Sequence, residues 1–389
     1  MPAPSTIDAL ALLRDLVSRP SVTPETAGVF DILEKALGSL GFAVTRLNFK
    51  GDGSYPVDNL FAIRGGGNGP RLLFAGHTDV VPTGPETAWT HPPFGAEIAD
   101  GRLYGRGACD MKSGIAAFLA AVSGFLAEGG GTGGTIALAI TNDEEADSVN
   151  GTEKLMAWTR EQGHEFDFAI VGEPSATARA GDSIKIGRRG SLNGQIRVIG
   201  VQSHVAYPEK GNNPVPVLAA IAQELAGVKL DTGSEHFPPS NLELTSIDVG
   251  NQTTNIIPAQ GTIRFNIRFN DRWTPESLTD WIGERIAAVD ARGCTVNFKQ
   301  VGRASRSFLS PLDGGVDLLA ATIAENTGTP PQLSTGGGTS DARFIAAYCP
   351  VVEFGLTGTS LHKVDEYVEL ADFEELIGLY AAFLKAYFA

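Results

Sequence analysis

The stretch "RLLFAGHTD", residues 71–79, decides the fold, because a short apolar run ends there in His77 and Asp79. Short apolar runs of this kind alternate with helical patterns along the chain. The helical patterns lie at 113–127 and 152–162, and the further apolar runs at 135–141 and 167–172. This alternation predicts an α/β domain with a largely parallel or mixed sheet.

Three of these predicted strands are followed by residue types that bind metal ions. His77 follows the first, Glu144 and Glu145 follow "TIALAIT", and Glu173 follows "DFAIVG". Ligands of open α/β sheets bind beyond the carboxyl ends of the strands. Adjacent acids in a loop are usually only solvated, and neighbouring side chains share a site only on irregular backbone. His77 and Glu173 at the neighbouring strand ends favour a functional site.

The pattern changes from about residue 188. The segments that follow read strand, helix, strand, strand, helix, strand, at 191–200, 213–227, 241–250, 261–269, 274–291 and 294–301. This βαββαβ order is ferredoxin-like and forms a small domain in itself. We therefore predict a catalytic domain over 1–187 and 302–389, with an inserted domain over 188–301. The last segment would return His362 to the edge of the first sheet.

Composition excludes several classes of protein. The 389 residues are 42% hydrophobic and 19% charged, as in a globular protein with room for two domains. The formal net charge of -15 disfavours nucleic acid and anionic membranes as partners. Three widely separated cysteines provide no disulfide framework. We find no signal-peptide pattern and no apolar run long enough to span a bilayer, so we expect a cytoplasmic protein.

The candidate ligands combine imidazole with carboxylate, which suits zinc or a similar divalent ion in a hydrolytic site. They are His77, Asp110, Glu144, Glu145, Glu173 and His362. Five ligands can serve two ions if one carboxylate bridges them. The spare acid can then face a reacting water, so adjacent Glu144 and Glu145 would be base and ligand.

The sequence resembles the M20 metallopeptidase family over essentially its whole length. The motifs are "FAGHTDVVPTG" (74–84), "LYGRGACDMKSG" (103–114), "TNDEEADSVNGT" (141–152), "VGEPS" (171–175), "GRRGS" (187–191), "SHVAYP" (203–208), "TGGGTSDARF" (335–344) and "EFGLTGTSLHKVDE" (353–366). Three of them, at 187–191, 203–208 and 335–344, resemble more narrowly the branch that acts on N-succinyl-L,L-2,6-diaminopimelate. The resemblance implies a two-domain α/β zinc hydrolase whose inserted ferredoxin-like domain forms a dimer.

The resemblance also implies a ligand set for two Zn²⁺ ions per subunit, with Co²⁺ as a possible substitute. Asp110 would bridge the two ions. His77 and Glu173 would complete one site, and Glu145 and His362 the other. The family further places a cis peptide bond after the bridging aspartate.

Catalytic roles carried over from the family fall on three residues. Glu144 would be the general base, and Asp79 would orient the imidazole of His77. His204 would stabilise the oxyanion from the partner subunit of a homodimer. The expected reaction is hydrolysis of N-succinyl-L,L-2,6-diaminopimelate to succinate and L,L-2,6-diaminopimelate, a step of lysine and meso-diaminopimelate biosynthesis.

An anionic N-acyl amino acid must be bound against the acidic charge of the protein, and arginine binds carboxylates through two parallel hydrogen bonds. The residues that match substrate-contacting positions of the family are Arg188, Ser191, Tyr207, Arg268, Gly338 and Thr339. Gly358 departs from the family, because some relatives carry Asn there.

Two other functions fit the same sequence. One is a related M20 deacylase or peptidase, such as an acetylornithine deacetylase or an aminoacylase, with the same metal residues and a different anion-binding set. The other is a non-catalytic binding protein on this fold. Glu144 argues against the second, because a metal-binding protein needs no further acid beside five ligands.

Overall fold

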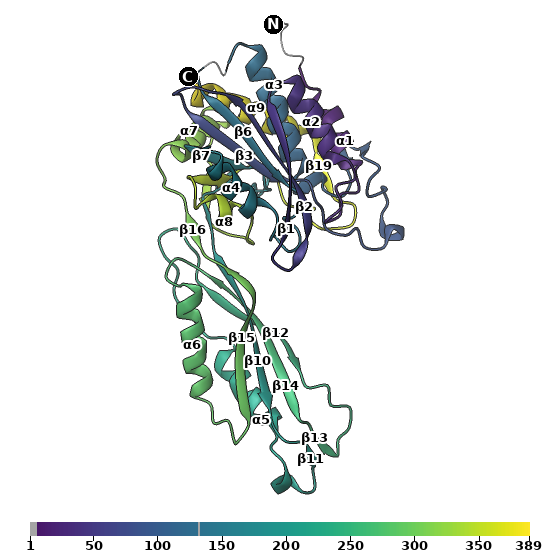
Figure 1. The fold of residues 1–389 in the computed structure, drawn as a ribbon, viewed down its shortest axis with the longest axis vertical. Helices are drawn as coiled ribbons and strands as arrows, with labels where there is room; N and C mark the ends of the chain where they lie inside the picture. Colours follow the sequence, from purple (N-terminus) through teal and green to yellow (C-terminus); the bar gives the residue numbers. More distant parts are fainter. Residues whose placement is uncertain (1–5, 131–132) are drawn as a thin grey trace. The chain divides into compact units, whose positions relative to one another are not determined.

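The structure is a computed structural model that describes residues 6–130 and 133–389. The chain forms two compact units (Figure 1). The first contains the residues up to Ile186 together with Ser310–Ser334 and Ser340–Ala389, and the second contains Gly187–Leu309 and Thr335–Thr339. The second unit therefore reaches past the predicted limit at residue 301. The reason is that β15 (Thr295–Ser305) continues beyond that limit and β16 (Phe308–Leu309) pairs with β9 (Gly187–Arg188).

An eight-stranded mixed sheet organises the first unit, in the order β1-β2-β6-β3-β7-β18-β8-β17. The strands are β1 (Ala43–Gly51), β2 (Ser54–Gly65), β3 (Arg71–His77), β6 (Thr135–Thr141), β7 (Phe168–Val171), β8 (Ser183–Lys185), β17 (Gln332–Ser334) and β18 (Val351–Glu353). β3 pairs in parallel with β6 and β7, and β18 pairs in parallel with β7. Parallel neighbours end at the same edge of a sheet, so the carboxyl ends of these strands meet there.

Helices cover both faces of this sheet. They are α1 (Ala9–Val17), α2 (Val29–Ser39), α3 (Ser113–Ala127), α4 (Thr152–Glu161), α7 (Gly315–Thr327), α8 (Ala342–Ile345) and α9 (Leu370–Tyr387). Side chains of a strand alternate between faces, and Ile136, Leu138 and Ile140 of β6 join the core formed with α1, α2, α3, α7 and α9. α4 contacts β6 and β2 but contributes nothing to that core. It therefore packs on the opposite face.

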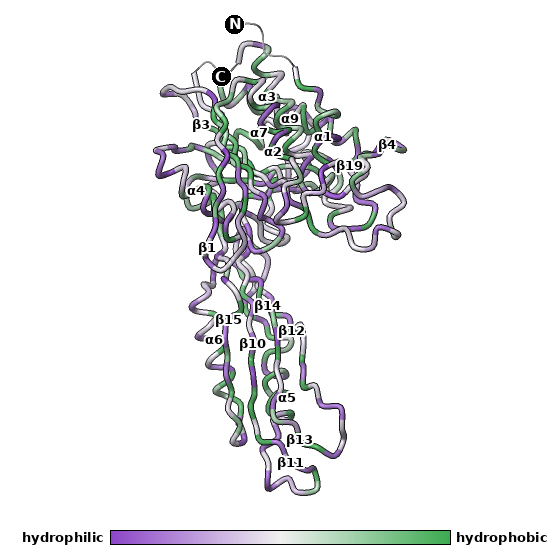
Figure 2. Tube along the Cα trace, turned by 45° about the vertical axis from the view of Figure 1, so that its right-hand side comes forward, coloured by the Kyte–Doolittle hydropathy of each residue, from purple (hydrophilic) through white to green (hydrophobic). Residues whose placement is uncertain are grey.

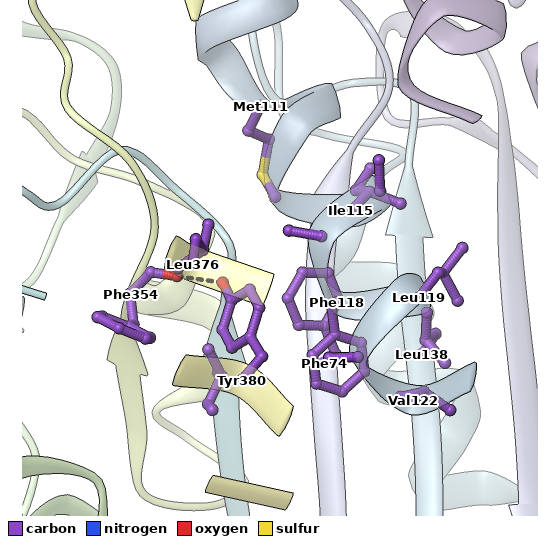
Figure 3. Close-up of a cluster of buried hydrophobic side chains, with 14 of the residues drawn as sticks. Phe74, Met111, Ile115, Phe118, Leu119, Val122, Leu138, Phe354, Leu376 and Tyr380 are labelled. Atoms are coloured by element: carbon purple, nitrogen blue, oxygen red, sulfur yellow. Dashed lines mark hydrogen bonds between the residues drawn. The ribbon is translucent and has the colours of Figure 1, made fainter. Parts of the chain in front are cut away.

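Aromatic packing links the middle strand to the two central helices (Figure 3). Phe74 of β3 stacks on Phe118 of α3 with 4.1 Å between ring centroids, and the ring of Tyr380 from α9 stands nearly perpendicular to both. The Tyr380 hydroxyl donates a hydrogen bond to the backbone oxygen of Phe354. A fully buried phenol thus has a polar partner, as such groups require.

Two glycines at the carboxyl edge allow Met111 to pack against the strand ends. A Cβ on Gly76 or on Gly172 would lie 2.4 Å or 2.8 Å from the Met111 Cε. Gly76 precedes His77, and Gly172 precedes Glu173. Close packing at Met111 therefore depends on glycine directly before two of the predicted ligands.

One helical stretch of the described chain is long and apolar enough to cross a membrane by length and composition alone. This stretch is Ala108–Ala127, and 89% of its most apolar part is buried inside the structure. This stretch includes α3, whose apolar residues face all sides because it lies under α1 and α9. Figure 2 shows the hydrophobic colouring concentrated along such central helices and strands.

A small three-stranded sheet completes the first unit. Its strands are β4 (Glu97–Ala99), β5 (Arg102–Tyr104) and β19 (Tyr367–Glu369), in the order β19-β5-β4. β19 follows the loop that carries His362 and leads into α9, while β5 precedes the segment that carries Asp110. Pairing of β19 with β5 therefore joins two ligand-bearing segments that are far apart in sequence.

The second unit has the predicted ferredoxin-like form, which confirms the fold class. Its antiparallel sheet has the order β12-β14-β10-β15, with β10 (Gly190–Ile199), β12 (Asn241–Asp248), β14 (Gln260–Phe269) and β15. α5 (Pro214–Leu225) and α6 (Pro275–Ala287) pack on it around a separate apolar core. A short pair, β11 (Ser203–His204) with β13 (Ile256–Ile257), lies beyond the end of β10 (Figure 1).

Candidate active site

The first predicted ligand group comes together as expected. The Nε2 atom of His77 lies 3.2 Å from Oδ1 of Asp110 and 3.4 Å from Oε1 of Glu173. The exposed fractions of the three residues are 1%, 7% and 7%, so the group is nearly enclosed. His77 is the last residue of β3, Glu173 lies two residues after the end of β7, and Asp110 lies in the turn (Ala108–Lys112) before α3.

The second ligand group shares Asp110 with the first. Nε2 of His362 lies 3.3 Å from Oδ2 of Asp110 and 3.0 Å from Oε1 of Glu145. One oxygen of Asp110 thus faces each group, the arrangement of a carboxylate that could bridge two ions. The peptide bond between Asp110 and Met111 is cis, as the family resemblance predicts. His362 has a φ of 60°, an uncommon conformation for a residue other than glycine.

The donor set of this centre fits metal ions. His77, Glu144 and Glu145 form a further group of possible ligands, so three overlapping groups meet here. All their ligand atoms are imidazole nitrogens or carboxylate oxygens, which suit zinc or a similar divalent ion. Carboxylates concentrated in an enclosed site need cations to balance their charge. The centre therefore matches the binding chemistry of divalent cations.

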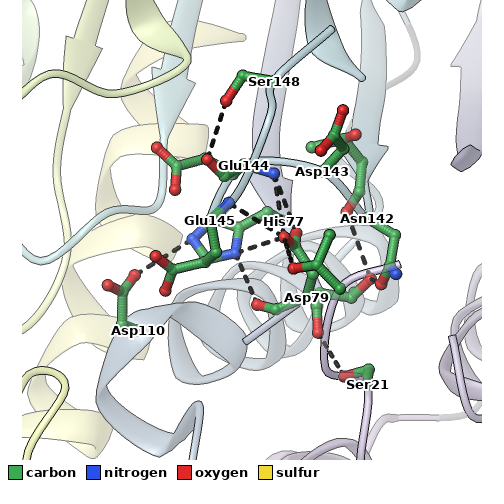
Figure 4. Close-up of polar contacts among 12 residues, drawn as sticks. Ser21, His77, Asp79, Asp110, Asn142, Asp143, Glu144, Glu145 and Ser148 are labelled. Carbon is green, nitrogen blue, oxygen red and sulfur yellow. Dashed lines mark hydrogen bonds and ion pairs between the residues drawn. The ribbon is translucent and has the colours of Figure 1, made fainter. Parts of the chain in front are cut away.

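Asp79 connects His77 to the loop that carries the two glutamates (Figure 4). Nδ1 of His77 lies 3.0 Å from the backbone oxygen of Asp79 and 3.6 Å from its carboxylate. That carboxylate accepts hydrogen bonds from the backbone N–H groups of Glu144 and Glu145 and from the Thr23 hydroxyl. Asp79 is fully buried, and it holds the imidazole through its backbone oxygen and the glutamate backbone through its carboxylate.

Tyr55 and Asp143 hold the glutamate loop from its other side. The Tyr55 hydroxyl donates to Asp143 at 2.6 Å and accepts from the N–H of Asp147 at 3.2 Å. The other oxygen of Asp143 accepts from the N–H groups of Val149 and Asn150. Asp143 points away from Asp110, whereas Glu145 points toward it (Figure 4). Adjacent acids therefore separate into one with a structural role and two at the centre.

Burial and mutual repulsion shift the pKa values of the acids in this centre. Burial, together with the charge of Asp110, raises the pKa of Glu173 to about 8. Burial and the charge of Glu173 raise the pKa of Glu144 well above its usual range. Hydrogen bonds with Asp110 and Glu145 raise the pKa of His362 to about 10. Glu144 makes backbone hydrogen bonds with Asp79 and Ser148, and its carboxylate lies close to His77 and Glu145.

All the predicted substrate-binding residues of the second unit except Tyr207 lie near the start of β10 or in the loop Thr335–Thr339. Arg188 is buried and donates to the backbone oxygen of Gly336 at 2.8 Å. Ser191 of β10 pairs in register with Arg268 of β14. The loop Thr335–Thr339, which holds the predicted residues Gly338 and Thr339, belongs to this unit.

His204 and Tyr207 lie at the other end of this sheet. His204 belongs to β11, and its Nδ1 accepts a hydrogen bond from the N–H of Ala206. Tyr207 is 52% exposed, and its ring centroid lies 5.8 Å from that of His204. Ten-residue β10 separates this pair from Ser191, a span of about 30 Å at about 3.3 Å per residue. The structure thus brings the predicted residues of this unit into two groups that do not meet within one chain.

Sequence reasoning missed several residues around the centre. Glu366 and Asp341 stand inside two of the quoted motifs, which was a signal for them. Asp341 is buried beside Glu144, and burial raises its pKa to about 6 while Arg343 opposes the shift. Tyr55 and Thr23 carried no local signal, because their contacts with the centre depend on tertiary folding.

Comparison with known proteins identifies the family of the chain. Residues 73–386 match peptidase family M20/M25/M40. The chain is 52% identical over 382 residues to the succinyl-diaminopimelate desuccinylase of Rhodospirillum centenum, covering 98% of both chains. It is also 52% identical over 382 residues to that of Gluconacetobacter diazotrophicus, covering 98% of this chain and 97% of the relative.

Solved structures share the fold at lower identity. An M20 family metallo-carboxypeptidase from Sulfolobus solfataricus is 19% identical with a TM-score of 0.77, covering 98% of this chain and 99% of its own. A dinuclear metal-binding M20 peptidase from Bacillus subtilis is 14% identical with a TM-score of 0.69, covering 97% and 96%. The extent of the family match and the identity to the full-length relatives establish the family. The chain belongs to peptidase family M20/M25/M40.

Proposed function

We propose that the protein hydrolyses N-succinyl-L,L-2,6-diaminopimelate to succinate and L,L-2,6-diaminopimelate. The observation that carries this proposal is Asp110, whose two oxygens face two separate ligand groups near the carboxylate of Glu144. The substrate class is supported by the names of relatives that are about half identical over nearly the full chain.

Two Zn²⁺ ions are the proposed cofactors, and Co²⁺ is a possible substitute. His77, Asp110 and Glu173 would hold one ion, and Asp110, Glu145 and His362 the other. When bound, such ions acidify water and polarise a carbonyl group. The chain itself orients the ligands, since Asp79 holds the imidazole of His77 through its Nδ1 side.

Glu144 is the proposed general base and acid. Its carboxylate would accept a proton from the attacking water and return it to the leaving amine nitrogen. A base works best when its pKa lies near the working pH, and burial raises the pKa of Glu144 from the ordinary value for a carboxyl. Hydrogen bonds from its backbone N–H to Asp79, and from the Ser148 hydroxyl to its backbone oxygen, keep the residue in place.

Substrate turnover tests the proposal directly. With zinc added, we expect hydrolysis of N-succinyl-L,L-2,6-diaminopimelate at a much higher kcat/KM than that of N-acetylornithine, measured by release of the free amine. A preference for N-acetylornithine would assign the protein to another deacylase activity, and no turnover of either substrate would contradict the proposal.

Arg188 and Arg268 are the proposed ligands of the substrate carboxylates. Lysine at either position keeps the charge but loses the planar pair of donors, so kcat/KM should fall by roughly tenfold or more while metal content is unchanged. Comparison with an N-acyl substrate that lacks the carboxylate provides the control. An equal loss on both substrates would show that the arginine does not recognise that group.

His204 is proposed to stabilise the oxyanion from the partner subunit of a homodimer. Support comes from within the second unit, where β10 separates His204 from Arg188 and Ser191 by about 30 Å. Stabilisation of an oxyanion requires a donor at about 3 Å. One small substrate cannot reach both groups of the same chain, so two chains would have to contribute. Tyr207, next to His204, would then come from the partner as well.

Mixing two inactive variants tests this sharing. We expect His204→Ala and Glu144→Gln chains, each inactive alone, to regain part of the wild-type rate after subunit exchange. A mixed dimer would contain one site with intact Glu144 and an intact His204 from the other chain. Chromatography of differently tagged chains shows whether mixed dimers form. Mixed dimers without recovered activity would mean that His204 does not act across chains.

A further inference from the structure

Glu366 lies in the loop after His362 and is fully buried. Its Oε1 atom accepts hydrogen bonds from the backbone N–H groups of Gly107, Cys109 and Asp110, at 3.0, 2.9 and 3.2 Å. Three donors on one oxygen fix the backbone of the segment that carries Asp110. This contact joins the segment of the shared carboxylate to the segment of His362.

The other oxygen of Glu366 forms a buried ion pair with Arg106 at 2.6 Å. Arg106 is 3% exposed and also donates to the backbone oxygens of Lys363 and Pro82. Both partners of the pair are therefore desolvated, and each compensates the charge of the other. Glu366 consequently has little freedom to move relative to the loop that it holds.

The backbone of both joined segments is irregular. Asp110 has φ -122° and ψ 101°, outside helical values within the turn Ala108–Lys112. His362 and Asp365 have φ values of 60° and 55°. Backbone hydrogen bonds, such as Lys112 N–H to Gly107 O and Lys363 N–H to Ser360 O, fix part of each segment, and side-chain contacts add to them. The Glu366 carboxylate provides three such contacts to the Asp110 segment.

We propose that Glu366 is a positioning residue that sets the placement of Asp110 relative to His362, and through it the metal affinity of the group formed by Asp110, Glu145 and His362. This inference rests on the proposed function, because it takes these three side chains as ligands. Loss of a group that supports a ligand typically costs about 10–100-fold in metal affinity. The loss should be smaller at the other group, since His77 at the end of β3 and Glu173 just after β7 are positioned by other elements.

A single substitution of Glu366 would leave Arg106 as an unpaired buried charge, which destabilises the fold by itself. Two double variants avoid this difficulty. Glu366→Gln with Arg106→Met keeps an acceptor oxygen for the three N–H groups, whereas Glu366→Met with Arg106→Met has the same charge and no acceptor. Glu369→Gln is the matched control. Glu369 lies three residues after Glu366 and also pairs with an arginine, Arg102 at 2.7 Å, but this pair is partly exposed.

Stepwise zinc binding to the metal-free proteins, followed by calorimetry, gives the readout. We expect Glu366→Met/Arg106→Met to bind one zinc ion about 10–100-fold more weakly, with Glu366→Gln/Arg106→Met and Glu369→Gln close to wild type. Equal zinc binding by the two double variants would overturn the proposal. Loss of both ions together with a lowered Tm of the metal-free protein would also overturn it, because Glu366 would then be a general structural residue.

Parallel titrations of Glu145→Ala and His362→Ala separate this inference from the proposed function. Each variant should weaken the binding of one zinc ion if the ligand set is right. Unchanged zinc binding in both would contradict the ligand set itself, whatever the Glu366 variants do. Weakened binding in these two, together with equal binding by the two double variants, would contradict only the role of Glu366.

Discussion

Glu144→Gln is expected to lower kcat by about 10²–10⁴-fold while zinc binding stays as in the wild type. The amide keeps the size of the side chain but cannot accept the proton of the attacking water. Two of the three ligand groups do not include Glu144, so the ions should remain. Measurement of kcat beside the zinc content of the purified variant checks both parts.

The neighbouring residue provides the control. Glu145→Gln should lose zinc from one site, because Oε1 of Glu145 lies beside His362 and the Asp110 group. Excess zinc should restore part of the activity of this variant and none of that of Glu144→Gln. The reverse pattern would exchange the roles of base and ligand.

The second large effect is expected at Asp110. Asp110→Asn should weaken the binding of both zinc ions, because each of its oxygens faces a different ligand group. The loss of affinity should exceed the about 10–100-fold loss that is typical when a supporting group is removed. The substitution nearly preserves volume, so packing around Met111 should be retained. Zinc titration by calorimetry and the Tm of the metal-free variant measure the two effects.

His362→Ala serves as the comparison for Asp110→Asn. It removes a ligand that contacts only one group, so one zinc ion should remain tightly bound. Loss of a single ion from Asp110→Asn as well would show that the aspartate serves one site and does not bridge two.

The sequence predicted the strands that carry the site because their signals are local. "LLFAG", "TIALAIT" and "DFAIVG" are short apolar runs, and the structure pairs them in parallel as β3, β6 and β7. Parallel pairing then brings His77, the glutamate loop and Glu173 to one edge of the sheet. The apolar pattern of the strands and the residues at their ends predict this arrangement. The βαββαβ order of the second unit was readable for the same reason.

The supporting contacts could not be read in the same way. Tyr55 lies 88 residues from Asp143, and Glu366 lies 256 residues from Asp110, so neither pair leaves a periodic pattern. The apolar stretch Ala108–Ala127 divides into an irregular turn and the buried helix α3. Burial by tertiary packing, which explains its composition, is not a property of the stretch alone.

The length of β10 has a kinetic consequence. If His204 must come from a second chain, the catalytic unit is assembled by association, and its amount follows mass action. The rate per chain should then be constant at high protein concentration and fall once dilution separates the subunits. A dilution series would thus report the dissociation constant of the dimer through enzyme turnover.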